Sequence, residues 1–183
     1  KKTPDYEIKT FKTDHKTSST GYALIETQRK GRFFREKAEE LGVPVGKDFS
    51  ILHEGNSITL KDGTIVSPEQ VIGPPRSGRK IAYTGDTRPT KTTIEAVSGF
   101  DLLIHDSTFT EEYKQRAKLT GHSTAIEAAD LATEADISHL VLTHISSRFS
   151  GNSKLLLNEA KNRFKGELTL AHDGLEIDIP YAD

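Results

Sequence analysis

Lys80-Ile81-Ala82-Tyr83-Thr84-Gly85-Asp86-Thr87-Arg88-Pro89 is an apolar run that ends at a glycine turn. The run is typical of a buried strand, and the turn exposes the carboxylate of Asp86 where that strand ends. Leu140-Val141-Leu142-Thr143-His144 repeats the pattern with a histidine. Layered α/β proteins bind ligands outside the carboxyl ends of their strands, so these ionisable residues are candidates for chemistry rather than architecture.

Strand-like and helix-like segments alternate along most of the chain, which favours a sheet covered by helices. The predicted strands are Tyr6–Lys12, Gly21–Glu26, Lys80–Tyr83, Asp101–His105, His139–Thr143, Leu168–Ala171 and Leu175–Ile179. The predicted helices are Phe33–Leu41, Thr92–Val97, Glu111–Leu119, Ala125–Glu134 and Ser153–Phe164. Residues 42–78 are rich in glycine and proline and offer little that could form a core. We expect them to be an arm inserted between two domain segments, 1–41 and 79–183.

The composition limits the classes of function. The 183 residues are enough for about one domain with a core, and no apolar run reaches the ~20 residues that a bilayer requires. The chain has no cysteine, so any metal must be held by His, Asp or Glu. A net charge of −2 gives no overall basic field, so a polyanion would need a local patch, such as the basic run from Arg29 to Lys37. This composition fits a cytoplasmic enzyme.

Several ionisable residues follow predicted strands and would meet at one edge of the sheet. They are His15, Asp86, His105, His122 and His144. Taken singly, each fits a capping or hydrogen-bonding role, but their recurrence favours a metal site, because zinc prefers imidazole nitrogen and carboxylate oxygen. The remaining histidines, His53, His139 and His172, fit surface roles better.

His122 lies in Gly121-His122-Ser123-Thr124, just before a predicted helix that Ser123 or Thr124 would cap. Asp106 could accept a hydrogen bond from one ring nitrogen of His122 and raise the basicity of the ring. His122 is therefore a candidate proton donor rather than a metal ligand.

The ordered set of motifs resembles the ribonuclease Z family, the transfer-RNA 3′-end endonucleases of the metallo-β-lactamase superfamily. The set consists of Asp14-His15 with Gly21-Tyr22, the Gly/Pro-rich arm, residues 78–89, His105-Asp106-Ser107-Thr108-Phe109, Gly121-His122-Ser123-Thr124 and residues 142–149. The resemblance covers nearly the whole chain. It implies the four-layer αββα metallo-β-lactamase fold, of which this chain supplies roughly the carboxyl-terminal half and a protruding RNA-binding arm.

The resemblance also assigns roles. His15, Asp86 and His144 match zinc ligands, with Asp86 bridging two zinc ions. His122 matches the histidine that protonates the leaving group, and Asp106 the acidic residue that orients it. Where the family commonly has a His-Glu-Ala-Thr motif, this chain has Asp106, one methylene shorter than Glu.

The implied substrate is precursor tRNA, cut so that a 3′-hydroxyl remains on the tRNA, and the implied assembly is a cytoplasmic homodimer. Residues expected to hold the phosphate are Ser147, Arg148, Thr87 and Arg88, because a guanidinium forks onto phosphoryl oxygens. Residues expected to contact the RNA backbone are Arg29, Lys30, Arg32, Arg35 and Lys47.

No His-x-His-x-Asp-His cluster, which the family carries upstream, occurs in this sequence. The first residue is Lys and the chain has no Met, so we expect it to be part of a longer protein. With three protein ligands at most, a complete dinuclear site is not expected from this chain alone. Two alternatives remain open: a hydrolase of the same fold acting on small esters or phosphodiesters, and a non-catalytic RNA-binding half that needs a complementing chain.

Overall fold

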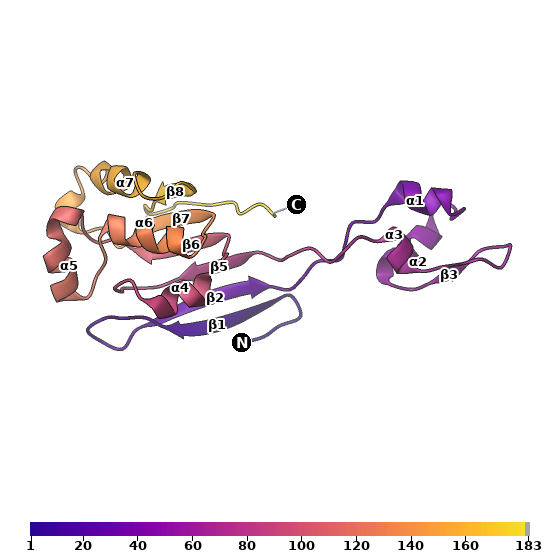
Figure 1. Cartoon of the computed structure of the whole chain (residues 1–183), viewed down its shortest axis with the longest axis horizontal. Coiled ribbons are helices and arrows are strands. Elements are labelled where there is room, and N and C mark those ends of the chain that lie inside the picture. Colours follow the sequence, from indigo (N-terminus) through magenta and orange to yellow (C-terminus); the bar gives the residue numbers. More distant parts are fainter. Residues whose placement is uncertain (182–183) are drawn as a thin grey trace. The chain divides into compact units, whose positions relative to one another are not determined.

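The computed structural model describes residues 1–181 and divides into two compact units (Figure 1). The first unit combines Lys1–Thr27 with residues 79–181, and the second is Gln28–Gly78. Among the described residues no helix has the length and apolar character needed to cross a membrane.

The first unit is built on a six-stranded sheet with the order β1-β2-β5-β6-β7-β8. Its strands are β1 (Tyr6–Lys12), β2 (Thr20–Glu26), β5 (Lys80–Tyr83), β6 (Leu102–Asp106), β7 (His139–Thr143) and β8 (Glu167–Leu170). β1, β2 and β5 pair antiparallel, whereas β5, β6, β7 and β8 are parallel. The parallel arrangement brings the carboxyl ends of β5, β6 and β7 to the same edge of the sheet, as the sequence predicted.

Helices cover one face of this sheet (Figure 1). They are α4 (Lys91–Val97), α6 (Ala125–Glu134) and α7 (Lys154–Lys161). The helix α5 (Lys114–Thr120) lies at the end of the unit (Figure 1), and the short 3-10 helices are η1 (Glu111–Tyr113) and η2 (Ser147–Phe149). Leu103, Leu140 and Leu142 share a buried cluster with the small residues Ala128 and Ala132 of α6, which let the helix lie close to the strands. The described chain thus supplies one sheet and one helix layer, half of the expected four layers.

The second unit contains α1 (Arg35–Glu40), α2 (Lys47–Glu54), β3 (Ile58–Thr59), β4 (Ile65–Val66) and α3 (Pro68–Val71). The expectation that this region lacks a core is wrong, because Ala38, Val43, Leu52, Val66 and Val71 are buried together. The unit also begins at residue 28 rather than 42. The region between 28 and 41 belongs to it because α1 contributes Ala38 to this small core.

Two predicted elements of the first unit differ from the structure. Glu111–Leu119 is not one helix, because η1 precedes α5. Leu175–Ile179 forms no strand. Instead, the Ile179 carbonyl accepts a hydrogen bond from Arg79 (3.2 Å), and Asp178–Tyr181 line a small pocket with His139 and Glu167. Along the segment half-buried and exposed residues alternate, so its alternating pattern is satisfied without strand pairing.

Candidate metal and acid–base site

Five predicted site residues meet at the carboxyl edge of the sheet. They are His15, Asp86, Asp106, His122 and His144. His15 follows β1, Asp86 follows β5, Asp106 ends β6, His122 follows α5 and His144 follows β7. The potential ligand atoms of His15, Asp86 and His122 lie within 4.8 Å of one another, and so do those of Asp106, His122 and His144. The site therefore comes from five segments that are distant in sequence.

Asp106 is fully buried and accepts hydrogen bonds on both carboxylate oxygens. Oδ1 accepts from the backbone N–H and the hydroxyl of Thr108, at 3.0 and 2.7 Å. Oδ2 accepts from the Thr87 N–H at 3.0 Å and from His122 Nδ1 at 2.7 Å. A carboxylate surrounded by donors holds each of them in a fixed orientation. The predicted contact between Asp106 and His122 is present, so the shorter Asp side chain reaches its partner.

The hydrogen bonds turn three imidazoles the same way. His15 Nδ1 donates to the Gly121 carbonyl at 2.8 Å, and His122 Nδ1 donates to Asp106. Thr108 Oγ1 lies 2.8 Å from His144 Nδ1. In each ring the δ nitrogen is occupied by a structural partner, which leaves Nε2 to face the space between the rings.

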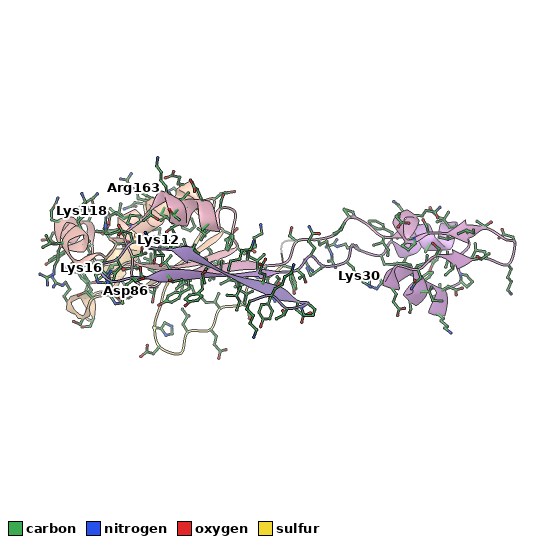
Figure 2. The ribbon with its side chains drawn as sticks, turned by 90° about the horizontal axis from the view of Figure 1, so that it is seen from below. Lys12, Lys16, Lys30, Asp86, Lys118 and Arg163 are labelled. Carbon is green, nitrogen blue, oxygen red and sulfur yellow. The ribbon has the colours of Figure 1, made fainter. Side chains whose placement is uncertain are left out.

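The three rings and Asp86 surround one small region. The rings of His122 and His144 are stacked with centroids 4.8 Å apart, and those of His15 and His122 are 4.9 Å apart. His144 Nε2 lies 3.5 Å from Asp86 Oδ2. Figure 2 shows Asp86 among the side chains at this end of the first unit. Nitrogen and oxygen donors in this arrangement are the donor set that zinc prefers in proteins without cysteine.

Two backbone features maintain this geometry. Gly121 has a φ of +81°, and a Cβ there would lie 2.8 Å from His15 Nδ1, so only glycine allows the close approach. His144 has a φ of +60°, a left-handed conformation that is uncommon for residues other than glycine. Such conformations cluster at functional sites, where neighbouring contacts hold them.

The predicted phosphate-binding residues divide into two pairs. Ser147 and Arg148 are exposed on η2, and the Arg148 guanidinium lies over the Tyr113 ring at 4.8 Å from its centroid. Thr87 and Arg88 are already engaged. Thr87 is fully buried and donates its hydroxyl to the Arg88 carbonyl.

Arg88 forms a two-pronged ion pair with Glu127 of α6 and also donates to the His122 carbonyl at 2.5 Å. The side chains of this pair are only 15% and 11% exposed. The expectation that Thr87 and Arg88 contact the substrate is therefore corrected, because the Thr87 hydroxyl and the Arg88 guanidinium are already bonded to other groups of the protein.

Sequence reasoning missed Glu127 and Thr108. Glu127 belongs to a capping box with Thr124, in which each side chain accepts the other's backbone N–H. The Thr-x-x-Glu pattern could have indicated it. Thr108 stands where the His-Glu-Ala-Thr motif has its threonine, so the motif could have indicated it, although not its partners.

His105, which the sequence placed in the same set, does not face the site. It is fully buried beneath the sheet edge, its Nδ1 donates to the Asp106 carbonyl at 2.7 Å, and its Nε2 has no partner among the described residues. Burial lowers the pKa of His105 below its ordinary value, because desolvation penalises the imidazolium form.

The predicted RNA-binding residues all belong to the second unit. Arg35 pairs with Glu39 at 2.7 Å, and Lys30 donates to the His53 carbonyl at 3.1 Å. Lys30, Arg32, Arg35 and Lys47 are exposed, whereas Arg29 is half-buried and donates to the Ser77 carbonyl. Their contact with RNA stays a prediction.

Comparison with known proteins gives a consistent picture. A family model described as a β-lactamase superfamily domain matches residues 51–145. Ribonuclease Z of Haloferax volcanii is 54% identical over 179 residues, which make up 98% of this chain and 56% of that relative. Ribonuclease Z of Myxococcus xanthus is 43% identical over 178 residues, 97% of this chain and 58% of that protein. This chain thus spans little more than half the length of these curated relatives.

Solved structures extend the likeness to the fold. Human tRNase Z, short form, superposes with a TM-score of 0.58 at 23% identity, covering 98% of this chain and 46% of that one. The metallo-β-lactamase fold protein YhfI from Bacillus subtilis gives a TM-score of 0.59 at 23% identity, covering 96% and 50%. The resemblance to ribonuclease Z and the predicted fold class are confirmed.

Proposed function

Because the chain belongs to the β-lactamase superfamily, we propose that it forms the carboxyl-terminal part of a zinc-dependent endoribonuclease that removes the 3′ trailer from precursor tRNA. The observation that carries the proposal is the His122–Asp106 pair, 2.7 Å apart, which faces Asp86, His15 and His144. Metal-assisted hydrolysis of a phosphodiester uses a metal-binding group together with a nearby group that transfers protons. The ribonuclease Z relatives supply the substrate class.

His15, Asp86 and His144 would hold zinc. Zinc supplies Lewis-acid polarisation of the scissile phosphate and activation of water. His122 gives a proton through Nε2 to the departing 3′ oxygen, which leaves a 3′-hydroxyl on the tRNA. Asp106 favours the charged ring, because its carboxylate accepts the Nδ1 hydrogen bond in a fully buried position.

Ser147 and Arg148, exposed beside this region, are the residues we assign to the phosphate. The basic residues of the second unit would contact the RNA backbone, with an affinity that falls steeply with salt. We further propose a cytoplasmic homodimer, as the family resemblance implies.

The pair is tested by His122→Gln and Asp106→Asn, with exposed His172→Gln as the matched control. Cleavage of a trailer-bearing precursor tRNA in the presence of zinc should fall by about 10²- to 10⁴-fold in the first two variants, because general acid catalysis contributes on that scale. RNA binding should not change. Full activity in either variant would refute the assignment. These activities are measured in the full-length protein, where RNA binding without cleavage would instead favour a non-catalytic RNA-binding role.

The second unit is tested by replacing Gln28–Gly78 with Asn-Gly, which leaves the three-residue loop Thr27-Asn-Gly between Glu26 and Arg79. This junction is feasible because the Glu26 N–H donates to the Arg79 carbonyl at 2.9 Å, so the two ends are paired neighbours in an antiparallel hairpin. We expect loss of tRNA cleavage with retained hydrolysis of a small phosphodiester. Unchanged tRNA cleavage would remove the RNA-binding role from this unit.

A further inference from the structure

Thr108 joins the two sides of the site through one hydroxyl group. The residue is only 5% exposed. Its Oγ1 donates to Asp106 Oδ1 at 2.7 Å and lies 2.8 Å from His144 Nδ1. A threonine hydroxyl has a single hydrogen, so it can donate to only one of these two neighbours.

The proton count decides the direction of both bonds. An ionised carboxylate only accepts hydrogen bonds, and Asp106 Oδ1 also receives the Thr108 N–H at 3.0 Å. The hydroxyl hydrogen therefore points to Asp106, and Oγ1 must accept from His144. This places a hydrogen on Nδ1 of His144 and, in the neutral ring, leaves a lone pair on Nε2. His144 Nε2 lies 3.5 Å from Asp86 Oδ2.

Thr108 also supports the backbone next to His144. Its carbonyl accepts the Ser146 N–H at 3.1 Å. The loop between these contacts contains the left-handed φ of +60° at His144. One residue thus contacts both the ring and the main chain of the strained segment, and such support is what keeps an uncommon conformation populated.

We propose that Thr108 is a positioning residue that fixes the Nδ1–H tautomer of His144 and so presents Nε2 to a metal ion. The inference rests on the proposed metal-binding role of His144. Thr108 also couples this ligand to the acid–base pair, because Asp106 holds Thr108 through Oδ1 and His122 through Oδ2.

The tautomer is measured directly by long-range ¹H–¹⁵N NMR of the imidazole groups in the metal-free protein, at mildly alkaline pH. The His144 signals are identified by their loss in His144→Gln. We expect a protonated Nδ1 in the unaltered protein and in Thr108→Ser, which keeps the hydroxyl. Thr108→Val removes the hydroxyl and should shift His144 toward the Nε2–H tautomer. A protonated Nε2 in the unaltered protein would overturn the proposal.

Zinc affinity, measured by competition with a chromophoric chelator, gives a second readout. Loss of a group that orients a ligating histidine typically weakens metal binding by about 10- to 100-fold, so we expect that loss in Thr108→Val and near-native binding in Thr108→Ser. Thr169→Val is the matched control, because Thr169 Oγ1 contacts His139 Nε2 at 2.8 Å in the same sheet but outside the site. Equal affinities in Thr108→Val and the unaltered protein would contradict the proposal.

The two readouts separate the inference from the proposed function. If the protein holds no zinc but His144 carries its hydrogen on Nδ1, the metal role fails and the tautomer assignment stands. If Thr108→Val does not fold, the unaltered protein and Thr108→Ser still decide the tautomer. RNA cleavage enters neither measurement.

Discussion

The buried ion pair between Arg88 and Glu127 should stabilise the protein beside the site, and removing one partner tests this. Replacing Arg88 with Met removes two bonds to the Glu127 carboxylate and one to the His122 carbonyl. The two side chains are 15% and 11% exposed, so the remaining carboxylate stays largely buried without its cation. Breaking a buried pair on one side typically costs about 3–5 kcal/mol of unfolding free energy. Glu127 keeps its bond from the Thr124 N–H at 3.0 Å, so we expect about 3 kcal/mol.

The double variant Arg88→Met/Glu127→Met completes the cycle. Removing both charges leaves no unpaired ion, and apolar replacement of a buried pair is often close to neutral. The double variant loses the bond from the Thr124 N–H to the Glu127 carboxylate, worth about 1 kcal/mol, but keeps the cap in which Thr124 Oγ1 accepts the backbone N–H of residue 127, so it should be more stable than Arg88→Met alone. Urea unfolding at neutral pH measures the unaltered protein, Arg88→Met, Glu127→Met and the double variant. Arg163→Met is the control, because Arg163 and Asp130 are 56% and 54% exposed at 3.6 Å and should contribute less than about 1 kcal/mol. Additive losses in the double variant would refute the reasoning.

The contribution of Glu127 to the free energy of unfolding should fall as the pH is lowered. Burial by itself raises the pKa of Glu127, but the Arg88 and Thr124 hydrogen bonds and the Arg88 charge outweigh it, so the pKa lies below the ordinary value. The unaltered protein therefore keeps this contribution above the unfolded-state pKa of about 4.3 and loses it as the pH falls through the lower, folded-state pKa. In Arg88→Met burial dominates, so protonation relieves the unpaired charge. The stability difference between the two proteins should shrink as the pH falls.

Two further predictions concern the residues behind the site. Gly121→Ala should weaken zinc binding and lower stability, since its Cβ would lie 2.8 Å from His15 Nδ1. Gly174→Ala is the control, because Gly174 has a similar φ of +77° and open space around it. It should show only the backbone cost of about 1–2 kcal/mol in urea unfolding. Equal zinc affinities in Gly121→Ala and the unaltered protein would contradict the role of Gly121 in placing His15. Because burial lowers the pKa of His105, the unfolded state takes up the proton first, so stability is full above about pH 6.5 and declines as the pH falls through the folded-state pKa. His105→Asn should flatten that slope while exposed His172→Asn leaves it, and an unchanged slope in His105→Asn would show that another group causes it.

Local pattern predicted the first unit well. β5 and β7 are short apolar runs bounded by turn residues, and the carboxyl ends of parallel strands must share an edge, so Asp86 and His144 could be placed together before their contacts were known. The second unit escaped the same reasoning. Its buried residues, such as Leu52, Val66 and Val71, lie in elements of two to eight residues, too short for a periodic signal to develop.

The roles of Thr87, Arg88 and Thr108 escaped prediction for a different reason. Whether an arginine beside an anion-binding site faces the substrate or a protein carboxylate depends on a partner distant in sequence, here Glu127 on α6. The composition of the chain and the spacing of its motifs do not show which residues distant in sequence are partners in space. The same holds for Asp106, whose pairing with His122 was predicted but whose bonds to Thr87 and Thr108 were not. The Asp106 carboxylate therefore bonds to the loops after β5, β6 and α5. A substitution in any of these loops should alter the position of His122 more than the packing of the core.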